Sequence, residues 1–293
     1  MAVGSVSGSR QMDGRVCVVT GATSGIGYVT ARELARRGAT VTVVGRNRDR
    51  TARCVAQIRQ ETGSEAVDSL LADLSSMTQV RALAEAVKAR HTRLDVLVNN
   101  AGAIFLTRHT TVDGYEMTFA LNHLAPFLLT NLLLDRLKAS VPARIVTTAS
   151  VAHTGAKIAF DDPNFQHSFY NAWSAYSQSK LANIMFTYEL ARRLEGTGVT
   201  ANAFHPGVVA SGFAHNGPLL SVAMTLARPM MVSAEEGAKT AIYVASSPAV
   251  EGVTGQYFTK EHPVRSSKES YNTESQRRLW EVSEELTGVQ LAV

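Results

Sequence analysis

Residues 15–27 read RVCVVTGATSGIG, and this stretch decides the fold. Arg15–Thr20 is a short and almost unbroken apolar run, as expected for a strand buried on both faces of a parallel sheet. A glycine-rich turn follows, and the segment Gly25–Arg37 then has the pattern of a helix. A strand, a glycine turn and a helix in this order open a βαβ unit, which can hold a dinucleotide pyrophosphate at the helix N-terminus.

The same alternation of apolar runs and helical segments continues along the chain. Further strands are predicted at Thr40–Val44, Ala66–Leu71, Leu94–Asn99, Ala143–Ala149, Val199–Phe204 and Gln256–Phe258. Helices are predicted at Asp49–Gln60, from Ser76 with Ser75 as the capping residue, at Tyr115–Leu137 with a kink at Pro126, at Trp173–Leu194 and at Ser233–Ser246. Strands that alternate with helices form parallel sheets. We therefore expect an α/β, Rossmann-type, doubly wound seven-stranded parallel sheet in a single domain.

The composition along the chain suggests three parts. Residues 1–13 are polar and small and lack the apolar core of a signal peptide, which predicts a disordered tail. Residues 14–262 are expected to form the dinucleotide-binding and catalytic domain, with a substrate lid at about 212–231. Residues 263–293 are expected to form a C-terminal extension that contains a helix.

Composition also argues against several classes of protein. The 293 residues are 45% hydrophobic and can bury one large core, while the net charge is only +4. The arginines are scattered along predicted helix faces (Arg32, Arg36, Arg37, Arg192, Arg193), which is typical of a solvated surface and not of nucleic-acid binding.

Cysteine and histidine usage bears on the compartment and on metal binding. Cys17 and Cys54 are two lone cysteines, which predicts free buried thiols in a reducing, cytoplasmic compartment. The eight histidines show no HExxH or paired Cys/His spacing, so no metal site is expected. No stretch approaches the ~18 apolar residues that a membrane-spanning helix needs, so no transmembrane segment is expected.

The turn after the first strand and the end of the second strand predict the cofactor. The turn has the spacing G-x-x-x-G-x-G, and we expect a pyrophosphate to contact Gly21, Thr23, Ser24, Gly25, Ile26 and Gly27. The second strand ends in Val44-Gly45-Arg46-Asn47, without the carboxylate that would bind the ribose of NAD. Arg46 can instead form forked hydrogen bonds to a 2′-phosphate, although it could also be a simple surface arginine. We therefore predict NADP(H), with Asn47 beside Arg46 at the site.

Three further residues form a pattern suited to proton transfer. Tyr176 and Lys180 are four positions apart on a predicted helix and so share one face. A nearby ammonium and the positive nicotinamide ring would both lower the tyrosine pKa from its usual value near ~10 and make the hydroxyl a useful general acid or base. Ser150 follows a central strand, where its hydroxyl could stabilise charge on a substrate oxygen. Taken singly, these could be an exposed pair and a turn residue.

Together these motifs resemble those of the short-chain dehydrogenase/reductase family, and most closely its retinol dehydrogenase-type branch. The resemblance runs from about Gly14 to Gly288 and is carried by TGATSGIG (20–27), Asp73-Leu74, NNAG (99–102), Asn122 in LNHLAPFLLT, Ser150, YxxxK at Tyr176 and Lys180, and Pro206-Gly207. The stretches AWSAYSQSKLANIMFTYELARRL (172–194) and RRLWEVSEELTGV (277–289) indicate the branch. Ser24 stands where some NADP-preferring members carry a basic residue.

The resemblance implies roles for individual residues. The catalytic set would be Asn122, Ser150, Tyr176 and Lys180. Tyr176 and Lys180 would also contact the cofactor, Lys180 by holding the nicotinamide ribose, and Asn122 would position a water that relays protons. The remaining cofactor contacts would be Asp73, Leu74, Asn100, Ala101, Gly102, Pro206, Gly207, Val209 and Ser211. His123 and His205 flank these motifs and are expected to be structural. The family also implies a homodimer or homotetramer that pairs through the long helices, unless the C-terminal extension caps that surface.

The expected substrate follows from two apolar loops. The lid region 212–231 holds leucines, valine, phenylalanine and methionines but only His215 and Arg228 as ionisable groups. The loop 152–172 adds Ile158, Phe160, Phe165 and Phe169. Such walls suit a lipophilic alcohol, aldehyde or ketone, unless these side chains only pack the lid onto the core. Two other functions stay open: a non-catalytic NADP-binding sensor, and an enzyme that modifies nucleotide sugars.

Overall fold

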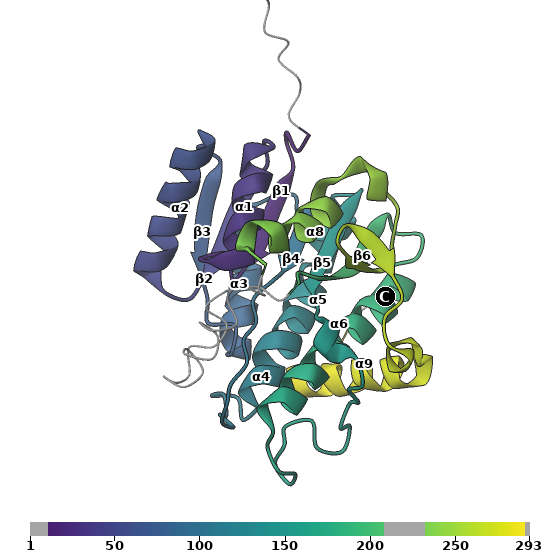
Figure 1. Cartoon of the computed structure of the whole chain (residues 1–293). Coiled ribbons are helices and arrows are strands. Elements are labelled where there is room, and N and C mark those ends of the chain that lie inside the picture. The colour runs from purple at the N-terminus through teal and green to yellow at the C-terminus, as the bar shows by residue number, and fades with distance from the viewer. Residues whose placement is uncertain (1–10, 208–231, 291–293) are drawn as a thin grey trace, which may run out of the picture.

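A computed structural model describes residues 11–207 and 232–290, and in this part of the chain one sheet lies between two layers of helices (Figure 1). The strands are β1 (Val16–Thr20), β2 (Thr40–Gly45), β3 (Val67–Leu71), β4 (Val96–Asn99), β5 (Ala143–Thr148), β6 (Val199–His205), β7 (Tyr257–Thr259) and β8 (His262–Val264). The helices are α1 (Gly25–Arg36), α2 (Arg48–Thr62), α3 (Met77–Arg90), α4 (Met117–Phe119), α5 (Ala125–Lys138), α6 (Ala172–Arg193), α8 (Ala234–Ser246) and α9 (Thr273–Thr287). Shorter helical segments are η1 (Ala120–Leu124), η2 (Val151–His153), η4 (Pro248–Val250) and η5 (Lys268–Tyr271).

The strand order is β3-β2-β1-β4-β5-β6-β7-β8, and the pairs from β3 to β7 are all parallel. The predicted seven-stranded parallel sheet is therefore confirmed, and β8 adds an antiparallel eighth strand that the sequence did not predict. The order reverses between β1 and β4. In open α/β sheets, ligands bind at such a reversal, beyond the carboxyl ends of the strands.

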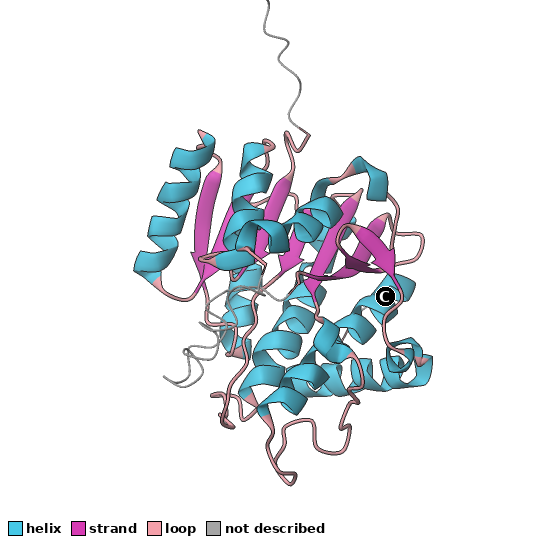
Figure 2. Ribbon diagram, in the orientation of Figure 1, coloured by secondary structure: helices cyan, strands magenta, loops and turns pink. Residues whose placement is uncertain are grey.

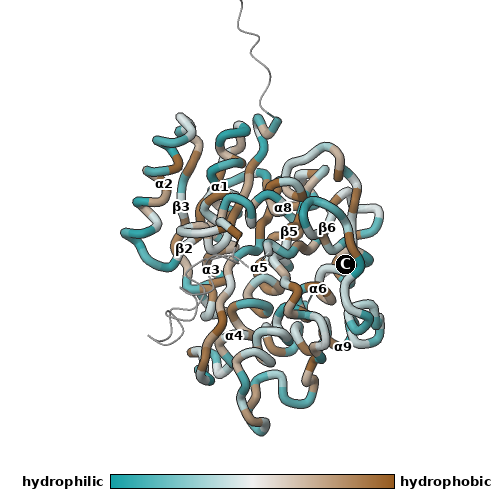
Figure 3. The backbone as a smooth tube through the Cα atoms, viewed as in Figure 1, coloured by the Kyte–Doolittle hydropathy of each residue, from teal (hydrophilic) through white to brown (hydrophobic). Residues whose placement is uncertain are grey.

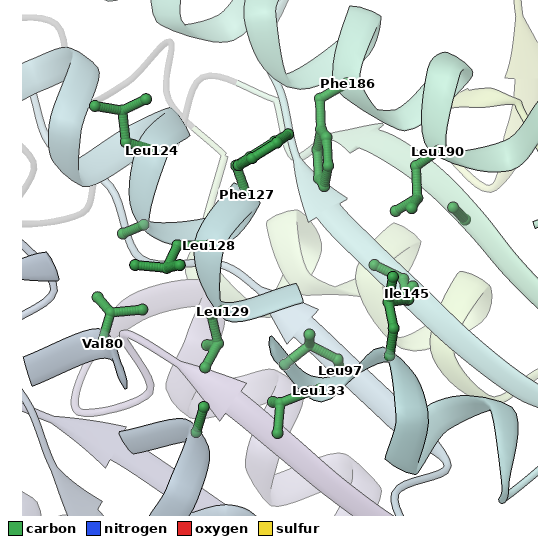
Figure 4. Close-up of a cluster of buried hydrophobic side chains, with 14 of the residues drawn as sticks. Val80, Leu97, Leu124, Phe127, Leu128, Leu129, Leu133, Ile145, Phe186 and Leu190 are labelled. Carbon is green, nitrogen blue, oxygen red and sulfur yellow. The ribbon is translucent and has the colours of Figure 1, made fainter. Parts of the chain in front are cut away.

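The sheet is buried because helices cover both of its faces. Helices α1, α2 and α8 lie on one face, and α3, α5 and α6 lie on the other (Figures 1 and 2). Side chains alternate between the two cores, since Val18 belongs to the core on the α5 side and Val19 to the core on the α1 side. Hydrophobic positions accordingly concentrate along the strands and inner helices (Figure 3), and Figure 4 shows Leu97 and Ile145 of the sheet within the α5-side core.

The helix predicted at Tyr115–Leu137 with a kink at Pro126 is interrupted by a π turn just before that proline. The backbone N–H of Ala125 donates to the carbonyl of Ala120, five residues back, which makes η1 a π-helical segment between α4 and α5. Pro126 lies near the start of α5 and, having no N–H, cannot bond the carbonyl of Asn122 four residues earlier. The irregularity therefore occurs one turn before the proline and contains Asn122. A second local correction is that Ser76, and not Ser75, caps α3.

The helical stretch Met117–Lys138 is, by length and hydropathy, able to cross a membrane, contrary to the expectation that no segment would qualify. Of its most apolar 18-residue window, 78% is buried inside the protein. Leu128, Leu129 and Leu133 belong to the core beneath the sheet. The stretch is placed as a helix of the hydrophobic core.

The C-terminal helix α9 covers α6 and is anchored by Trp280. This side chain is only 2% exposed, and its ring packs edge-on to Phe127 at 4.9 Å and stacked on Phe186 at 5.8 Å. The guanidinium of Arg193 lies 4.2 Å from the Trp280 ring. Because residues 175–191 of α6 are all buried within one chain, the helix through which pairing was expected is already covered.

The ends of the described region refine the predicted boundaries. Met12 is buried and its N–H donates to the Arg37 carbonyl, while the Gln11 side chain donates to the carbonyl of Ser246. Residues 11–13, which the sequence analysis placed in a disordered tail, thus pack against the domain. The predicted lid at 212–231 lies outside the described residues.

Candidate functional site

A cavity of about 490 Å³ opens at the carboxyl ends of the parallel strands. It is lined by the loops that follow β1, β2, β3, β4, β5 and β6 and by the first turns of α6. Of the predicted site residues, the lining includes Gly21, Thr23, Ser24, Gly25, Ile26, Gly27, Arg46, Asp73, Leu74, Asn100, Ala101, Gly102, Ser150, Tyr176, Lys180, Pro206 and Gly207. The fold therefore brings motifs from the whole length of the chain to one place.

The glycine turn after β1 interlocks with the loop after β4. Gly21 has φ +63°, and a Cβ there would lie 2.7 Å from the Cα of Ala101. A Cβ on Gly27 would lie 2.4 Å from Nδ2 of Asn100, which donates to the carbonyls of Thr20 and Gly21 at 3.0 and 3.3 Å. A larger residue at either glycine would push the two loops apart and distort the floor of the cavity.

The N-terminus of α1 faces this cavity without a side-chain cap. Ser24 is its N-cap residue, but the Ser24 side chain accepts no backbone hydrogen bond, and no acidic residue lies in the first turn. By contrast, the N-cap side chains of α2, α3, α6 and α8 all accept backbone N–H groups. The first N–H groups of α1 and the positive end of its dipole are thus left for an anionic ligand.

Two arginines line the cavity at the end of β2. Arg46 was predicted, whereas Arg50, one helical turn further on in α2, was missed even though the spacing of four in RNRDR could have suggested it. Asn47 does not line the cavity, because its side chain accepts the N–H of Arg50 and caps α2. A Cβ on Gly45 would lie 2.4 Å from Oγ1 of Thr51, so an acidic residue cannot be introduced there without distortion.

Ser150, Tyr176 and Lys180 meet at the other end of the cavity. The side chains of Ser150 and Tyr176 are hydrogen-bonded to each other. Nζ of Lys180 lies 5.5 Å from the centre of the Tyr176 ring and donates to the carbonyl of Thr148 at 3.2 Å. Tyr176 and Lys180 are 8% and 2% exposed and so almost fully withdrawn from water, whereas Ser150 is half-buried.

Burial has the largest effect on the pKa values of Tyr176 and Lys180. It raises the pKa of Tyr176 to about 12, which outweighs the lowering effect of the hydrogen bond with Ser150. Burial also lowers the pKa of Lys180 to about 8. The sequence analysis expected the Lys180 ammonium and the nicotinamide ring together to lower the tyrosine pKa, and without the ring the effect of burial is the larger one. At neutral pH Tyr176 is a phenol and Lys180 is mainly an ammonium.

Asn122 lies behind the cavity and joins its walls. Its Oδ1 accepts the N–H of Ala103 at 2.9 Å, and its Nδ2 donates to the Ala103 carbonyl at 2.9 Å and to Oγ of Ser179 at 3.0 Å. Both ends of the side-chain amide are therefore engaged by protein groups. The relay water predicted for Asn122 stays a prediction.

The two histidines beside the motifs differ in position. His123 is fully buried, and its Nε2 hydrogen-bonds with Oγ of Ser283 on α9, away from the cavity. His205 lines the cavity, although it was expected to be structural. Burial lowers the pKa of each to about 4, so both are neutral at physiological pH.

The cavity is apolar next to Tyr176. Six apolar side chains line the cavity, and the sequence analysis assigned none of them to the site: Ile104, Phe105, Met117, Leu121, Val151 and Trp173. Trp173 precedes Tyr176 by three positions on α6, and their ring centres are 6.1 Å apart. The i, i+3 spacing on one helix could have indicated Trp173, and Ile104, Phe105 and Val151 directly follow predicted motifs.

Some predictions fall outside the site as described. Val209 and Ser211 lie outside the described residues. Within residues 11–207 and 232–290, no group of three or more His, Cys, Asp or Glu side chains is arranged to hold a metal ion. Cys17 and Cys54 are free thiols in the core and take no part in the cavity.

Comparisons with known proteins agree with this geometry. Residues 15–218 match the family model described as short chain dehydrogenase. The chain is 44% identical over 280 residues to retinol dehydrogenase 12 of Mus musculus, covering 96% of this chain and 88% of that protein. It superposes on a crystal structure of an uncharacterized protein from Mycobacterium paratuberculosis with a TM-score of 0.78 and 35% identity, covering 96% of each chain. The Pseudomonas aeruginosa RhlG/NADP active-site complex gives a TM-score of 0.69 with 29% identity, over 90% of this chain and 98% of that one.

Proposed function

The chain belongs to the short-chain dehydrogenase family of oxidoreductases, in its retinol dehydrogenase-like branch, and from this premise we propose that it interconverts a lipophilic alcohol and its aldehyde or ketone with NADP(H). The observation that carries the proposal is the contact between the half-buried Ser150 and the buried Tyr176, with Lys180 beside it, in the wall of the cavity.

The cavity fits a dinucleotide along its whole length. The uncapped N-terminus of α1 suits the pyrophosphate, because its free N–H groups and dipole favour negative charge. Gly21 and Gly27 keep the backbone close to the opposite loop, which leaves room for the phosphates. Asp73, Leu74 and Lys180 also line the cavity, and the family resemblance assigns the first two to the adenine and Lys180 to the nicotinamide ribose. When bound, the nicotinamide would supply the hydride chemistry.

The preference for NADP(H) rests on the pair Arg46 and Arg50. Both line the cavity where β2 ends, and a 2′-phosphate would be the anionic group within their reach. The bound NADP named for the Pseudomonas aeruginosa relative supports the same choice.

Three side chains, Tyr176, Ser150 and Lys180, would transfer the proton and stabilise the negative charge that develops during the reaction. In the reducing direction the Tyr176 hydroxyl gives its proton to the substrate oxygen, and in the oxidising direction the Tyr176 oxygen takes it back. The Ser150 hydroxyl donates a hydrogen bond to the same substrate oxygen and stabilises its negative charge. The ammonium of Lys180 favours the phenolate that Tyr176 becomes after giving up its proton.

A lipophilic substrate fits the walls around Tyr176. Among the described lining residues near it, the ionisable groups are Tyr176, Lys180 and His205, so no cation is left to anchor an acid or phosphate group. Trp173 and Val151 are 61% and 49% exposed, which leaves apolar surface for a substrate to cover. The named substrate of the retinol dehydrogenase relatives is likewise an apolar alcohol.

Two further parts of the proposal concern location and assembly. A cytoplasmic location is supported by the two free cysteines, both of which are buried as reduced thiols. A homodimer or homotetramer would have to pair through a face other than α6, because α9 covers that helix.

A substrate screen tests the proposed function. NADPH and NADH consumption should be followed with aldehydes and ketones of increasing hydrocarbon size. We expect activity with NADPH that rises as the hydrocarbon part of the substrate grows. Each buried CH₂ should add up to ~0.8 kcal/mol of binding free energy until the cavity is full. Equal turnover of small polar carbonyls would refute the substrate class, and NADPH binding without any turnover would favour the non-catalytic sensor.

A further inference from the structure

His153 bridges the loop of Ser150 to the C-terminal extension. It ends η2, three residues after Ser150, and is only 3% exposed. Its Nδ1 lies 2.6 Å from the backbone oxygen of Ser150, and the backbone nitrogen of Ser267 lies 3.0 Å from its Nε2. The second contact joins residues that are 114 positions apart in the sequence.

The partners of the ring define its tautomer. A backbone carbonyl can only accept a hydrogen bond, so Nδ1 of His153 carries the proton that bonds Ser150. A backbone N–H can only donate, so Nε2 is the unprotonated acceptor for Ser267. One neutral tautomer satisfies both contacts. Burial lowers the pKa of His153, which favours this neutral form at pH 7.

Hydrogen bonds hold both the side chain and the backbone carbonyl of Ser150. Its side-chain oxygen accepts the N–H of Ala152 at 3.2 Å and is hydrogen-bonded with the Tyr176 side chain. Its carbonyl accepts both the N–H and the Nδ1–H of His153. The ring of His153 thus fixes the Ser150–Val151 peptide bond, and with it the position of the Ser150 hydroxyl that contacts Tyr176.

The Ser267 end of this bridge is connected by further hydrogen bonds to α6, the helix that carries Tyr176. Ser270 donates to the carbonyl of Ser267 at 2.6 Å, and its oxygen also lies 2.6 Å from Oγ of Ser266. Ser266 in turn hydrogen-bonds with the hydroxyl of Tyr188 on α6 at 2.7 Å. The loop of Ser150 and helix α6 are therefore tied together through the extension as well as through the site itself.

We propose that His153 is a positioning residue for the proposed reaction, which holds Ser150 in register with Tyr176 by joining the Ser150 carbonyl to the C-terminal extension. The rival explanation is that the ring only fills space against Tyr257, to which it packs edge-on at 5.1 Å. The two explanations differ in what they predict for substitutions that keep one hydrogen bond at a time. Displacing a group at a reacting centre by about 1 Å can cost ~10²-fold in rate.

Three variants separate the contacts of the ring. His153→Asn keeps a donor near the position of Nδ1, His153→Gln keeps an acceptor near that of Nε2, and His153→Phe keeps only the ring. We expect kcat with NADPH and an apolar ketone to stay within about threefold for Asn but to fall roughly 10- to 100-fold for Gln and Phe. The Kd for NADPH should stay within about twofold in all three, because the phosphate turn and Lys180 are untouched.

A double-mutant cycle completes the test. Because His153 acts through Ser150, adding His153→Gln to Ser150→Ala should lower kcat by less than about twofold. Only variants with the circular dichroism spectrum of the wild type are compared. If His153→Phe does not fold, the comparison of His153→Asn with His153→Gln decides whether His153 positions Ser150.

Different results overturn different parts of the account. An undiminished kcat in His153→Gln, equal losses in Asn and Gln, or a full additional loss on top of Ser150→Ala would refute the role of His153. A wild-type chain that reduces no carbonyl and oxidises no alcohol would refute the proposed function, and the role of His153 would fall with it.

Discussion

Lys180→Met should make the protein more stable while abolishing its activity. Lys180 is 2% exposed, and burial lowers its pKa from the usual 10.5 to about 8. Each pKa unit corresponds to about 1.4 kcal/mol, so keeping the ammonium buried at pH 7 costs the folded state about 3 kcal/mol. Methionine has a similar length and no charge, so the substitution removes this cost.

The substitution Lys180→Met also removes one hydrogen bond, which offsets part of the gain in stability. Nζ of Lys180 donates to the carbonyl of Thr148, but Nδ2 of Asn183 donates to the same carbonyl at 3.1 Å and would keep it satisfied. With about 1 kcal/mol subtracted for the lost bond, Lys180→Met should raise the free energy of unfolding by roughly 2 kcal/mol at pH 7.

The difference should also depend on pH. The folded protein gives up the Lys180 proton above about pH 8, whereas the unfolded chain keeps it until about pH 10.5. The wild type therefore gains stability as the pH rises through this window, and its deficit relative to Lys180→Met should shrink by about 1 kcal/mol between pH 7 and pH 9.

Denaturant unfolding of the cofactor-free protein, followed by circular dichroism, measures both effects. Lys157→Met is the matched control, because Lys157 is exposed and its replacement should change the free energy of unfolding by less than about 0.5 kcal/mol. The reasoning would be refuted if Lys180→Met were no more stable than the wild type at pH 7, or if the difference did not narrow at pH 9. Full activity in Lys180→Met would refute its place in the site.

The remaining predictions concern catalysis, cofactor choice, pH and assembly. Tyr176→Phe should keep NADPH binding but lower turnover by at least ~10²–10⁴-fold, and near-normal turnover would overturn the mechanism. Arg46→Ala should weaken NADPH by about 1.5–3 kcal/mol and NADH hardly at all, with a smaller selective effect for Arg50→Ala; equal losses for both cofactors would remove the 2′-phosphate assignment. The KM for NADPH should rise as the pH passes about 8, because Lys180 then loses its proton, and a flat profile from pH 7 to 9 would contradict this. Sedimentation at micromolar concentration should give two or four times the 31.5 kDa mass of one chain if a face other than α6 pairs, and the mass of a single chain would refute the proposed homo-oligomer.

Much of the fold could be predicted because its signals are local. Strands such as β1 and β4 are apolar runs bounded by glycine or polar residues, and parallel strands bring their carboxyl ends to one edge. Motifs at residues 20–27, 99–102, 150 and 206–207 therefore had to meet once the strand order was known. The short strand β8 escaped prediction because His262, Pro263 and Val264 are all exposed and show no alternation.

The parts of the site that were missed depend on contacts distant in sequence. No local spacing links His153 to Ser267, or Trp280 to Phe127, because these pairs form only when the C-terminal extension folds back onto the domain. The roles of Asn47 and Asn122 differ from expectation for a related reason. Amides compete for nearby backbone groups, and which groups come near is decided by tertiary packing.

The central claim is hydride transfer with Tyr176 as the proton donor, and isotope transfer measures it directly. The chain should be incubated with an apolar ketone and NADPH that is deuterated at nicotinamide C4, one diastereomer at a time, and the product alcohol analysed by mass spectrometry. The account predicts deuterium on the carbinol carbon with one of the two diastereomers for the wild type, and at least ~10²-fold less product for Tyr176→Phe. Alcohol formed without deuterium from either diastereomer, or equal product from Tyr176→Phe, would contradict it.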